Sequence, residues 1–134
     1  MSFWDKVSGI YDLAESLNKK AYREMLCNTA RLVPMSAKVL DCAAGTGELS
    51  IAASKNAESV ISTDLSEKML ETAEKKCKRK GIKNIFFDTR DIFSLDDADE
   101  SYDVVIAGNV LHLIENPEIA LSELARVTKK GGRL

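Results

Sequence analysis

Proline, cysteine and long apolar runs are all scarce in this chain. Its 134 residues include 2 prolines and 3 cysteines. An odd number of cysteines with no Cys-x-x-Cys spacing argues against a disulfide framework and a zinc site, and it indicates a reducing compartment. No apolar run approaches the roughly 20 residues of a membrane-spanning helix, and charged residues interrupt the N-terminal segment where a signal peptide needs an apolar core. We therefore expect a cytoplasmic protein without a metal or a membrane partner.

An excess of charge of one sign is also missing. The chain has 19 basic and 21 acidic side chains and a net charge of −2, which gives no electrostatic reason to expect nucleic acid as a partner. Hydrophobic residues make up 45% of the sequence and charged residues 30%, as is typical of soluble globular proteins. The length predicts one domain, which buries roughly two-thirds of its unfolded surface.

A turn of small residues follows the first predicted strand. The apolar residues 38–40 indicate a buried strand, and Asp41 ends it. Ala43, Gly45 and Gly47 then lead into a helix that we expect to reach about residue 55. Small side chains let the backbone approach a ligand closely, and the amides of the helix start can donate to it. The carboxylate beside them favours a ligand with both a cation and a carboxylate over a pyrophosphate. A plain tight strand–helix junction is the alternative.

A second acid ends the next predicted strand. Residues 59–63 are mostly β-branched or small and lead to Asp64, 23 positions after Asp41. Strand, helix and strand in this span predict a right-handed βαβ unit with parallel, adjacent strands. A carboxylate at this strand end can accept hydrogen bonds from a ribose diol. It could instead cap the predicted helix 67–80, but Ser66 already suits that role.

A third acid follows the third predicted strand, at residues 84–87. Asp91 can accept a hydrogen bond from the amino group of an adenine, while Ile92 and Leu65 can close on the faces of its ring. The acidic residues 94–101 are expected to form a solvated loop rather than a metal site. Calcium binding would need oxygen-ligand spacing and a glycine turn, and this run contains no glycine.

The last third of the chain predicts a strand, a helix and the start of another strand. Residues 102–109 are apolar, as in a strand that is buried on both faces. Asn116 and Pro117 predict the N-cap and first residue of a helix that runs to Lys129 and ends at Gly131-Gly132. Residues 133–134 would then open a fifth strand. This arrangement would leave the fourth strand at an open edge, where it could pair with a second copy, and it suggests a truncated chain.

The N-terminal residues show helical spacing and a concentration of aromatic side chains. Apolar residues between positions 3 and 32 predict one or two amphipathic helices. Four of the eight aromatic residues lie here, namely Phe3, Trp4, Tyr11 and Tyr22. They can form the hydrophobic face of a docked helix, or they can line a lid over a ligand.

Together these motifs resemble the class I S-adenosylmethionine-dependent methyltransferases. Motif I is similar to Asp41–Gly47, with Ala43 in place of the usual first glycine. Motif II is similar to Asp64-Leu65, motif III to Asp91-Ile92 and motif IV to the fourth strand. The resemblance implies an α/β fold with a doubly wound, mostly parallel, Rossmann-like sheet that is incomplete at its C-terminal edge. It also implies a helical lid over residues 1–34 and a cofactor-binding core over residues 35–134.

The resemblance further implies a cofactor, S-adenosylmethionine, with S-adenosylhomocysteine as its product, and a role for each motif. Asp41 and the backbone around Ala43, Gly45 and Gly47 would hold the methionine part of the cofactor. The ribose would bind Asp64, and the adenine would bind Asp91 between Leu65 and Ile92. Tyr11 would close over the cofactor from the lid, and Asn109 would line the pocket.

The acceptor implied by the resemblance is a small molecule. Residues 109–113, Asn-Val-Leu-His-Leu, resemble the quinone-pathway C-methyltransferases. His112, the sole histidine, is the candidate base for acceptors that must lose a proton. A structural or exposed histidine is the other interpretation of this residue.

Two other functions stay open at this level. A nicotinamide-dinucleotide fingerprint, Gly-x-Gly-x-x-Gly, would begin at Gly45 and would need glycine where Ser50 stands. This partial match allows a dinucleotide-dependent oxidoreductase. The third alternative is a cofactor-binding fragment without activity of its own.

Overall fold

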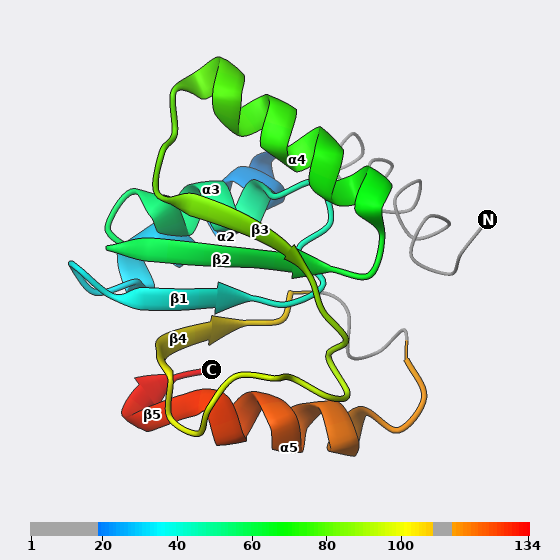
Figure 1. Cartoon of the computed structure of the whole chain (residues 1–134). Coiled ribbons are helices and arrows are strands. Elements are labelled where there is room, and N and C mark those ends of the chain that lie inside the picture. Colours follow the sequence, from blue (N-terminus) through cyan, green and yellow to red (C-terminus); the bar gives the residue numbers. More distant parts are fainter. Residues whose placement is uncertain (1–18, 109–113) are drawn as a thin grey trace.

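A five-stranded parallel sheet with helices on both faces forms the body of the protein (Figure 1). The computed structural model describes residues 19–108 and 114–134. In chain order, the elements are α2 (Lys19–Leu32), β1 (Lys38–Asp41), α3 (Glu48–Ser54), β2 (Ser59–Asp64), α4 (Glu67–Lys80), β3 (Ile85–Thr89), β4 (Tyr102–Ile106), α5 (Pro117–Val127) and β5 (Thr128–Arg133). Within these ranges, no helix is long and apolar enough to cross a membrane.

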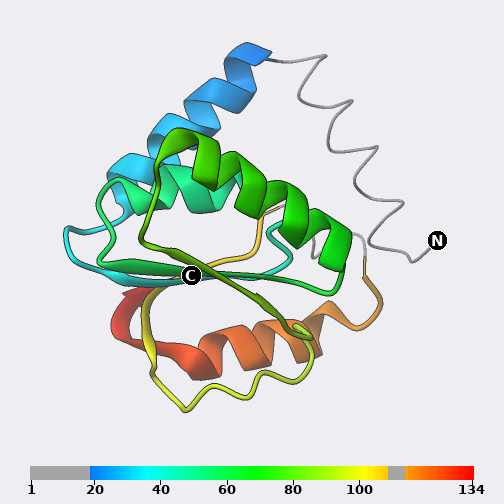
Figure 2. The ribbon, with the colours of Figure 1, turned by 45° about the horizontal axis from the view of Figure 1, so that its top comes forward.

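The strand order is β3-β2-β1-β4-β5, and every neighbouring pair is parallel. Helices α2, α3 and α4 cover one face of the sheet, and α5 covers the other (Figure 2). The connections from β1 and from β4 therefore leave toward opposite faces, although the two strands are neighbours. The expected doubly wound, mostly parallel sheet is confirmed.

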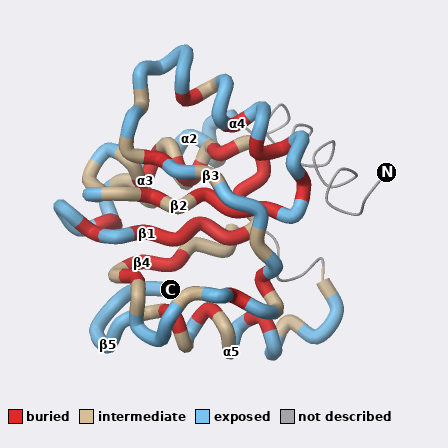
Figure 3. Tube along the Cα trace, in the orientation of Figure 1, coloured by how far each residue is buried: buried red, intermediate tan, exposed pale blue. Residues whose placement is uncertain are grey.

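The central strands contribute to a separate hydrophobic cluster on each face of the sheet. Val39 and Val104 pack toward α2, α3 and α4, whereas their neighbours Leu40 and Val105 pack toward α5. This alternation explains why β1 is buried along most of its length (Figure 3). Strands covered on both faces read as continuous apolar runs, which is the pattern seen in the sequence.

Helix α4 begins and ends where the sequence predicts. The Ser66 hydroxyl accepts a hydrogen bond from the Met69 amide at 3.2 Å, as an N-cap does. At the other end, Gly81 has a left-handed φ of 70°, the conformation that stops a helix. Both signals are local to the helix, so the sequence alone is enough to set its limits.

The end of α5 differs from the prediction. The helix stops at Val127, and Thr128 is already extended, with ψ of 132°. Strand β5 then runs through the glycine pair, and Gly131, with φ of 77°, lies within it. Pairing with β4 is the physical reason, because a parallel partner satisfies the backbone groups that a further helical turn would otherwise satisfy.

The expectation that the fourth strand forms an open edge is therefore wrong. Strand β4 lies between β1 and β5, and β5 is the outer strand on that side. Most of β5 is exposed, and its sequence, Thr-Lys-Lys-Gly-Gly-Arg, is basic. Lysine and glycine on an outer strand discourage pairing with another chain.

Candidate functional site

The turn after β1 lies where the sheet topology places ligands. In open parallel sheets, ligands bind beyond the carboxyl ends of two neighbouring strands whose connections leave toward opposite faces. Here those strands are β1 and β4, which are joined at their ends by a hydrogen bond from the Cys42 amide to the Ile106 carbonyl, at 2.8 Å. The small-residue turn, residues 41–47, follows β1 directly. The topology and the sequence motif thus indicate the same place.

Three residues of the turn have left-handed backbones. Their φ angles are 53° at Ala43, 59° at Gly45 and 85° at Gly47. A Cβ on Gly47 would lie 3.0 Å from the Cβ of Ala73, so the absence of a side chain lets the turn before α3 approach α4 closely. Ala43 adopts a conformation that costs a non-glycine residue roughly 1 kcal/mol or more. Ala43, which replaces the usual first glycine, therefore adds strain to the turn but still adopts a left-handed conformation.

Hydrogen bonds attach this turn to β2 and to itself. The Ala44 amide donates to the Thr63 carbonyl at 2.9 Å, and the Gly47 amide donates to the Ala44 carbonyl at 3.1 Å. The Gly45 amide donates to Oδ2 of Asp64 at 2.9 Å. The amides of both glycines, which we expected to face a ligand, are thus used within the protein. The two glycines instead allow the left-handed turn, and their lack of side chains would let the backbone come close to a ligand.

Asp41 is a buried carboxyl group in a small polar network. Its side chain is 1% exposed, and its Oδ2 accepts a 2.6 Å hydrogen bond from the Ser50 hydroxyl. The Ser50 oxygen also lies 2.8 Å from the Ser62 hydroxyl oxygen. Among the residues that the structure describes, none is a hydrogen-bond partner for Oδ1 of Asp41.

The surroundings of Asp41 favour its neutral form. The pKa of Asp41 is raised to about 7, mainly by burial; the Asp64 carboxylate acts in the same direction, and hydrogen bonding to Ser50 acts against it. A carboxyl group near neutrality in a ligand cleft is a frequent mark of a functional site. A cation placed beside it would favour the carboxylate form.

Asp64 lies at the end of the neighbouring strand and connects two turns. It is 2% exposed, and its two oxygens accept from the Gly45 and Ser66 amides, each at 2.9 Å. It therefore holds the turn after β1 against the turn after β2. Each carboxylate oxygen has two acceptor sites, so a carboxylate in general can accept a hydroxyl as well as two amides.

The third predicted acid lies farther out. Asp91 is exposed, and its Oδ1 accepts from the Phe93 amide at 2.9 Å, which shapes the turn after β3. Leu65 is 41% exposed, as expected of a side chain that covers a ligand. Ile92 is 4% exposed and packs in the cluster next to α5. Of the two expected ring contacts, Leu65 is open and Ile92 already has a packing role.

The acidic residues 94–101 form a mostly exposed loop, as expected, and Asp97 also anchors this loop to the fold. A nitrogen of Arg90 contacts both carboxylate oxygens of Asp97, at 2.7 and 2.9 Å, and the Tyr102 hydroxyl donates to Asp97 at 2.6 Å. Arg126 donates to the backbone carbonyls of Leu95 and Asp97 at 2.9 and 2.8 Å. The sequence offered no local signal for these contacts, because both arginines lie outside the acidic run.

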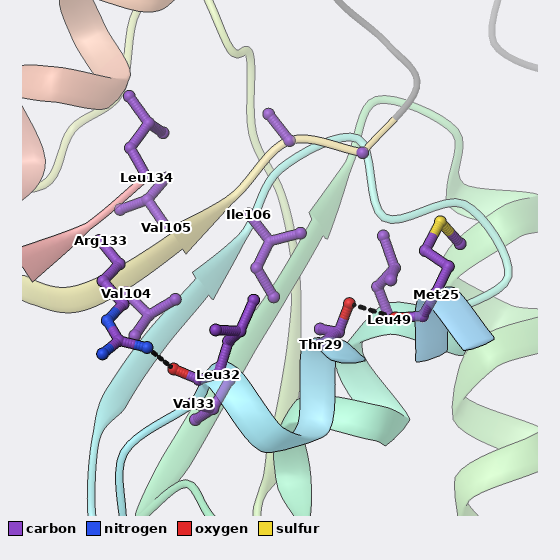
Figure 4. Close-up of a pocket in the computed structure, with 12 residues that line it drawn as sticks. Met25, Thr29, Leu32, Val33, Leu49, Val104, Val105, Ile106, Arg133 and Leu134 are labelled. Carbon is purple, nitrogen blue, oxygen red and sulfur yellow. Dashed lines mark hydrogen bonds between the residues drawn. The ribbon is translucent and has the colours of Figure 1, made fainter. Parts of the chain in front are cut away.

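A mostly apolar pocket of about 560 Å³ lies between α2, the start of α3 and the end of β4 (Figure 4). The residues around it are Met25, Thr29, Leu32, Val33, Leu49, Val104, Val105, Ile106, Ala107, Gly108, Arg133 and Leu134. Arg133 donates to the Leu32 carbonyl at 2.7 Å and links the end of the chain to α2. The three acids do not line this pocket, so it adjoins the acidic site without containing it.

Several sequence predictions concern residues outside the described ranges. Tyr11, Asn109 and His112 all belong to the parts of the chain that the structure does not describe, so their roles stay predictions. Cys42 is described, and it is 1% exposed. Burial raises its pKa to about 12, as suits a packing residue better than a nucleophile. Residues 19–108 and 114–134 contain no cluster of three or more candidate metal ligands.

Comparison with known proteins gives consistent matches. A family model described as a methyltransferase domain matches residues 35–134. The ubiquinone/menaquinone biosynthesis C-methyltransferase UbiE of Bdellovibrio bacteriovorus is 39% identical over 99 residues, which cover 72% of this chain and 42% of that protein. The demethylmenaquinone methyltransferase of Clavibacter sepedonicus is 33% identical over 138 residues, covering 99% of this chain and 55% of the relative. This chain thus spans about half the length of the curated relatives it matches.

The solved structures agree with the family match. The YcgJ protein from Bacillus subtilis superposes with a TM-score of 0.77 and 28% identity, over 82% of this chain and 48% of that one. The family model spans the whole sheet, from the residues before β1 to the end of β5. The sheet, the turn after β1 and the matched sequence therefore lead to one conclusion: this chain belongs to the methyltransferase domain family.

Proposed function

We propose that this chain binds S-adenosylmethionine and serves in the transfer of its methyl group to a small-molecule acceptor. The observation that supports this most directly is the pair of buried acids, Asp41 and Asp64, at the ends of β1 and β2 on either side of a left-handed turn. A nucleoside that also has an amino acid tail presents a diol and an ammonium group, and two separate acids suit these two groups.

The unpaired Oδ1 of Asp41 provides the test of fit for the methionine end. A buried acceptor without a partner costs about 1–3 kcal/mol, more if it is charged. An ammonium group placed beside it supplies both a donor and a positive charge, which removes this cost. Phosphate groups would increase the cost, because they bring negative charge next to Asp41 and Asp64.

The ribose and adenine ends follow along the sheet. Asp64 accepts a hydroxyl of the ribose in addition to its two backbone amides, and Leu65 covers the adenine ring from the next position. Asp91 accepts from the adenine amino group at the edge of the site. The proposal also divides the chain into a lid, residues 1–34, and a core, residues 35–134. In it, Tyr11 of the lid closes over the cofactor and Asn109 lines the pocket.

The protein contributes orientation and exclusion of water to the reaction. S-adenosylmethionine supplies a methyl group on a sulfonium sulfur, which is already activated toward displacement. The residues of this chain hold the donor in line with the acceptor, and a closed apolar site keeps water out. For acceptors that must lose a proton, His112 serves as the base.

The acceptor that we propose is a small apolar molecule. Two relatives are named for ubiquinone or menaquinone methylation, and the pocket beside the end of β4 is lined mainly by apolar side chains. Free thiols at Cys27, Cys42 and Cys77 are compatible with the reducing cytoplasm, where we place the protein.

The structure also weakens the dinucleotide alternative. Ser50 stands where the fingerprint needs its last glycine, and its hydroxyl is bonded to Asp41. Comparison by calorimetry tests the proposal: the chain should bind S-adenosylhomocysteine and should not bind NAD. Binding of NAD alone would overturn it. Methyl transfer from S-adenosylmethionine to demethylated quinones then distinguishes an active enzyme from a fragment that binds cofactor only.

A further inference from the structure

Three buried polar side chains from three different elements form a chain of hydrogen bonds that ends at Asp41. Ser50 on α3 and Ser62 on β2 are each 0% exposed. The Ser50 hydroxyl oxygen lies 2.6 Å from Oδ2 of Asp41 and 2.8 Å from the Ser62 oxygen. The cofactor roles proposed above use Asp41 and neither serine.

The direction of each hydrogen bond follows from counting protons. A serine hydroxyl has one proton to donate and can accept two hydrogen bonds. When Asp41 is ionised, its carboxylate can only accept, so the single proton of Ser50 goes to Asp41 and the Ser62 hydroxyl then donates to Ser50. A hydroxyl that also accepts a hydrogen bond becomes a better donor. Ser62 therefore strengthens the bond that Ser50 makes.

This arrangement fixes one oxygen of Asp41 and spares the other. Oδ2 of Asp41 accepts from the Ser50 hydroxyl, and the backbone carbonyl of Asp41 accepts from the Thr63 hydroxyl at 3.0 Å. Rotation of the carboxyl group would break the bond to Ser50. Oδ1 has no partner in the described part of the chain, so it is the atom left to meet a ligand.

We propose that Ser50, supported by Ser62, is a positioning residue for cofactor binding, which holds Asp41 in the orientation and the charge state that receive the cofactor's ammonium group. This inference rests on the proposed function and adds to it two residues that act through Asp41. The Ser50 bond favours the carboxylate form of Asp41, and so does the incoming cation, so the two effects act together.

The inference makes cofactor affinity depend on pH around neutrality. The pKa of Asp41 is raised to about 7, with burial as the main cause. Two titratable groups in the described ranges lie next to it: Asp64, at the end of β2, raises its pKa, and the buried Cys42 directly follows β1. Glu48, at the start of α3, forms an ion pair with Lys76 of α4.

The test is a calorimetric titration with S-adenosylhomocysteine between about pH 6 and 8.5, the range in which Asp41 ionises. The wild-type affinity should rise with pH to a plateau. Ser50→Ala should bind roughly tenfold more weakly at neutral pH, and the midpoint of its pH profile should move upward. Ser54→Ala is the matched control, because Ser54 lies on the same helix but donates to the Ile51 carbonyl. It should retain the wild-type affinity and midpoint.

Ser62→Ala should move the midpoint in the same direction by a smaller amount, and it supplies the test if Ser50→Ala does not fold. A Ser50→Ala variant with the wild-type midpoint would overturn the inference, whether its affinity is unchanged or is reduced equally at every pH, since the latter indicates packing alone. Absence of binding by the wild-type chain would instead overturn the proposed function, and the inference with it.

Discussion

The guanidinium group of Arg90 contacts both carboxylate oxygens of Asp97 through one nitrogen, at 2.7 and 2.9 Å. The two residues lie on either side of Asp91, and both side chains are largely shielded from solvent, at 21% and 12% exposed. The ion pair therefore closes the segment that positions the proposed adenine acceptor.

Arg90→Met should destabilise the fold and weaken cofactor binding. The variant keeps most of the apolar stem but leaves Asp97 with the Tyr102 hydroxyl as its side-chain donor. We expect a loss of about 1.5–3 kcal/mol in the free energy of unfolding, the usual value for hydrogen bonds to a charged group. Urea denaturation measures it. Arg79→Met on the exposed end of α4 is the control and should change stability by less than about 0.5 kcal/mol.

Ala43→Gly should leave the fold unchanged or make it more stable, by up to about 1 kcal/mol. The reason is the left-handed φ of 53° at this position, which glycine adopts without strain. Ala44→Gly, one residue later, should destabilise the fold by roughly 0.5–1 kcal/mol, because Ala44 has no such strain to relieve. Thermal unfolding of both variants gives the comparison. A loss of stability in both would show that strain at Ala43 is negligible.

Gly47→Ala should be more damaging than Gly81→Ala, although both glycines have left-handed backbones. Each substitution adds roughly 1–2 kcal/mol of backbone strain. At Gly47 the new Cβ also lies 3.0 Å from the Cβ of Ala73, whereas no atom lies within 4 Å at Gly81. Urea denaturation of the two variants separates the steric effect from the strain. Equal losses in the free energy of unfolding would mean that the backbone at Gly47 shifts away from Ala73 at no cost.

Asp41→Asn should stabilise the fold increasingly as pH rises from about 4 to 7.5. The folded pKa of about 7 lies above the ordinary aspartate pKa of 3.8, so the unfolded chain ionises at a lower pH than the folded one. Folding is then opposed by the ionisation of Asp41, and the wild type loses stability across this range. When Asp41 is fully ionised in both states, this effect lowers the free energy of unfolding of the wild type, relative to Asp41→Asn, by on the order of 4 kcal/mol. Unfolding curves at several pH values measure it.

Asp103→Asn is the control of opposite sign for this pH experiment. The hydrogen bond from the Lys38 amide lowers the pKa of Asp103, with the Lys129 side chain as a further cause. The stability from Asp103 is therefore present above its ordinary pKa and is lost as pH falls through the lowered value. If the difference between the wild type and Asp41→Asn were the same at every pH, Asp41 would not titrate in this range.

Local signals let the sequence predict most of the fold. Ser66 and Gly81 mark the ends of α4, and the apolar runs before Asp41 and Asp64 mark β1 and β2. These features act within a few residues of the chain, which is the distance over which sequence patterns are informative.

Contacts between distant residues account for what the sequence did not reveal. Strand β5 has no apolar alternation, and its register against β4 selects the extended form. Likewise, Ser50 is one polar residue on a short helix, and only the folded sheet brings it to Asp41. Arg126 reaches the acidic segment across 31 positions of sequence.

The two backbone amides bound to Asp64 offer a direct readout of the site. The Gly45 and Ser66 amides are held by a single buried carboxylate, each at 2.9 Å. A ribose hydroxyl that binds this carboxylate shares its charge with both amides, and we expect it to alter both bonds. Amide hydrogen exchange at Gly45 and at Ser66 should therefore both change when a nucleoside binds. The amide of Ile82, which follows α4 and donates to the Cys77 carbonyl within it, should keep its exchange rate. Through the Asp64 side chain, the exchange rates in the turns after β1 and β2 would both report whether a nucleoside is bound.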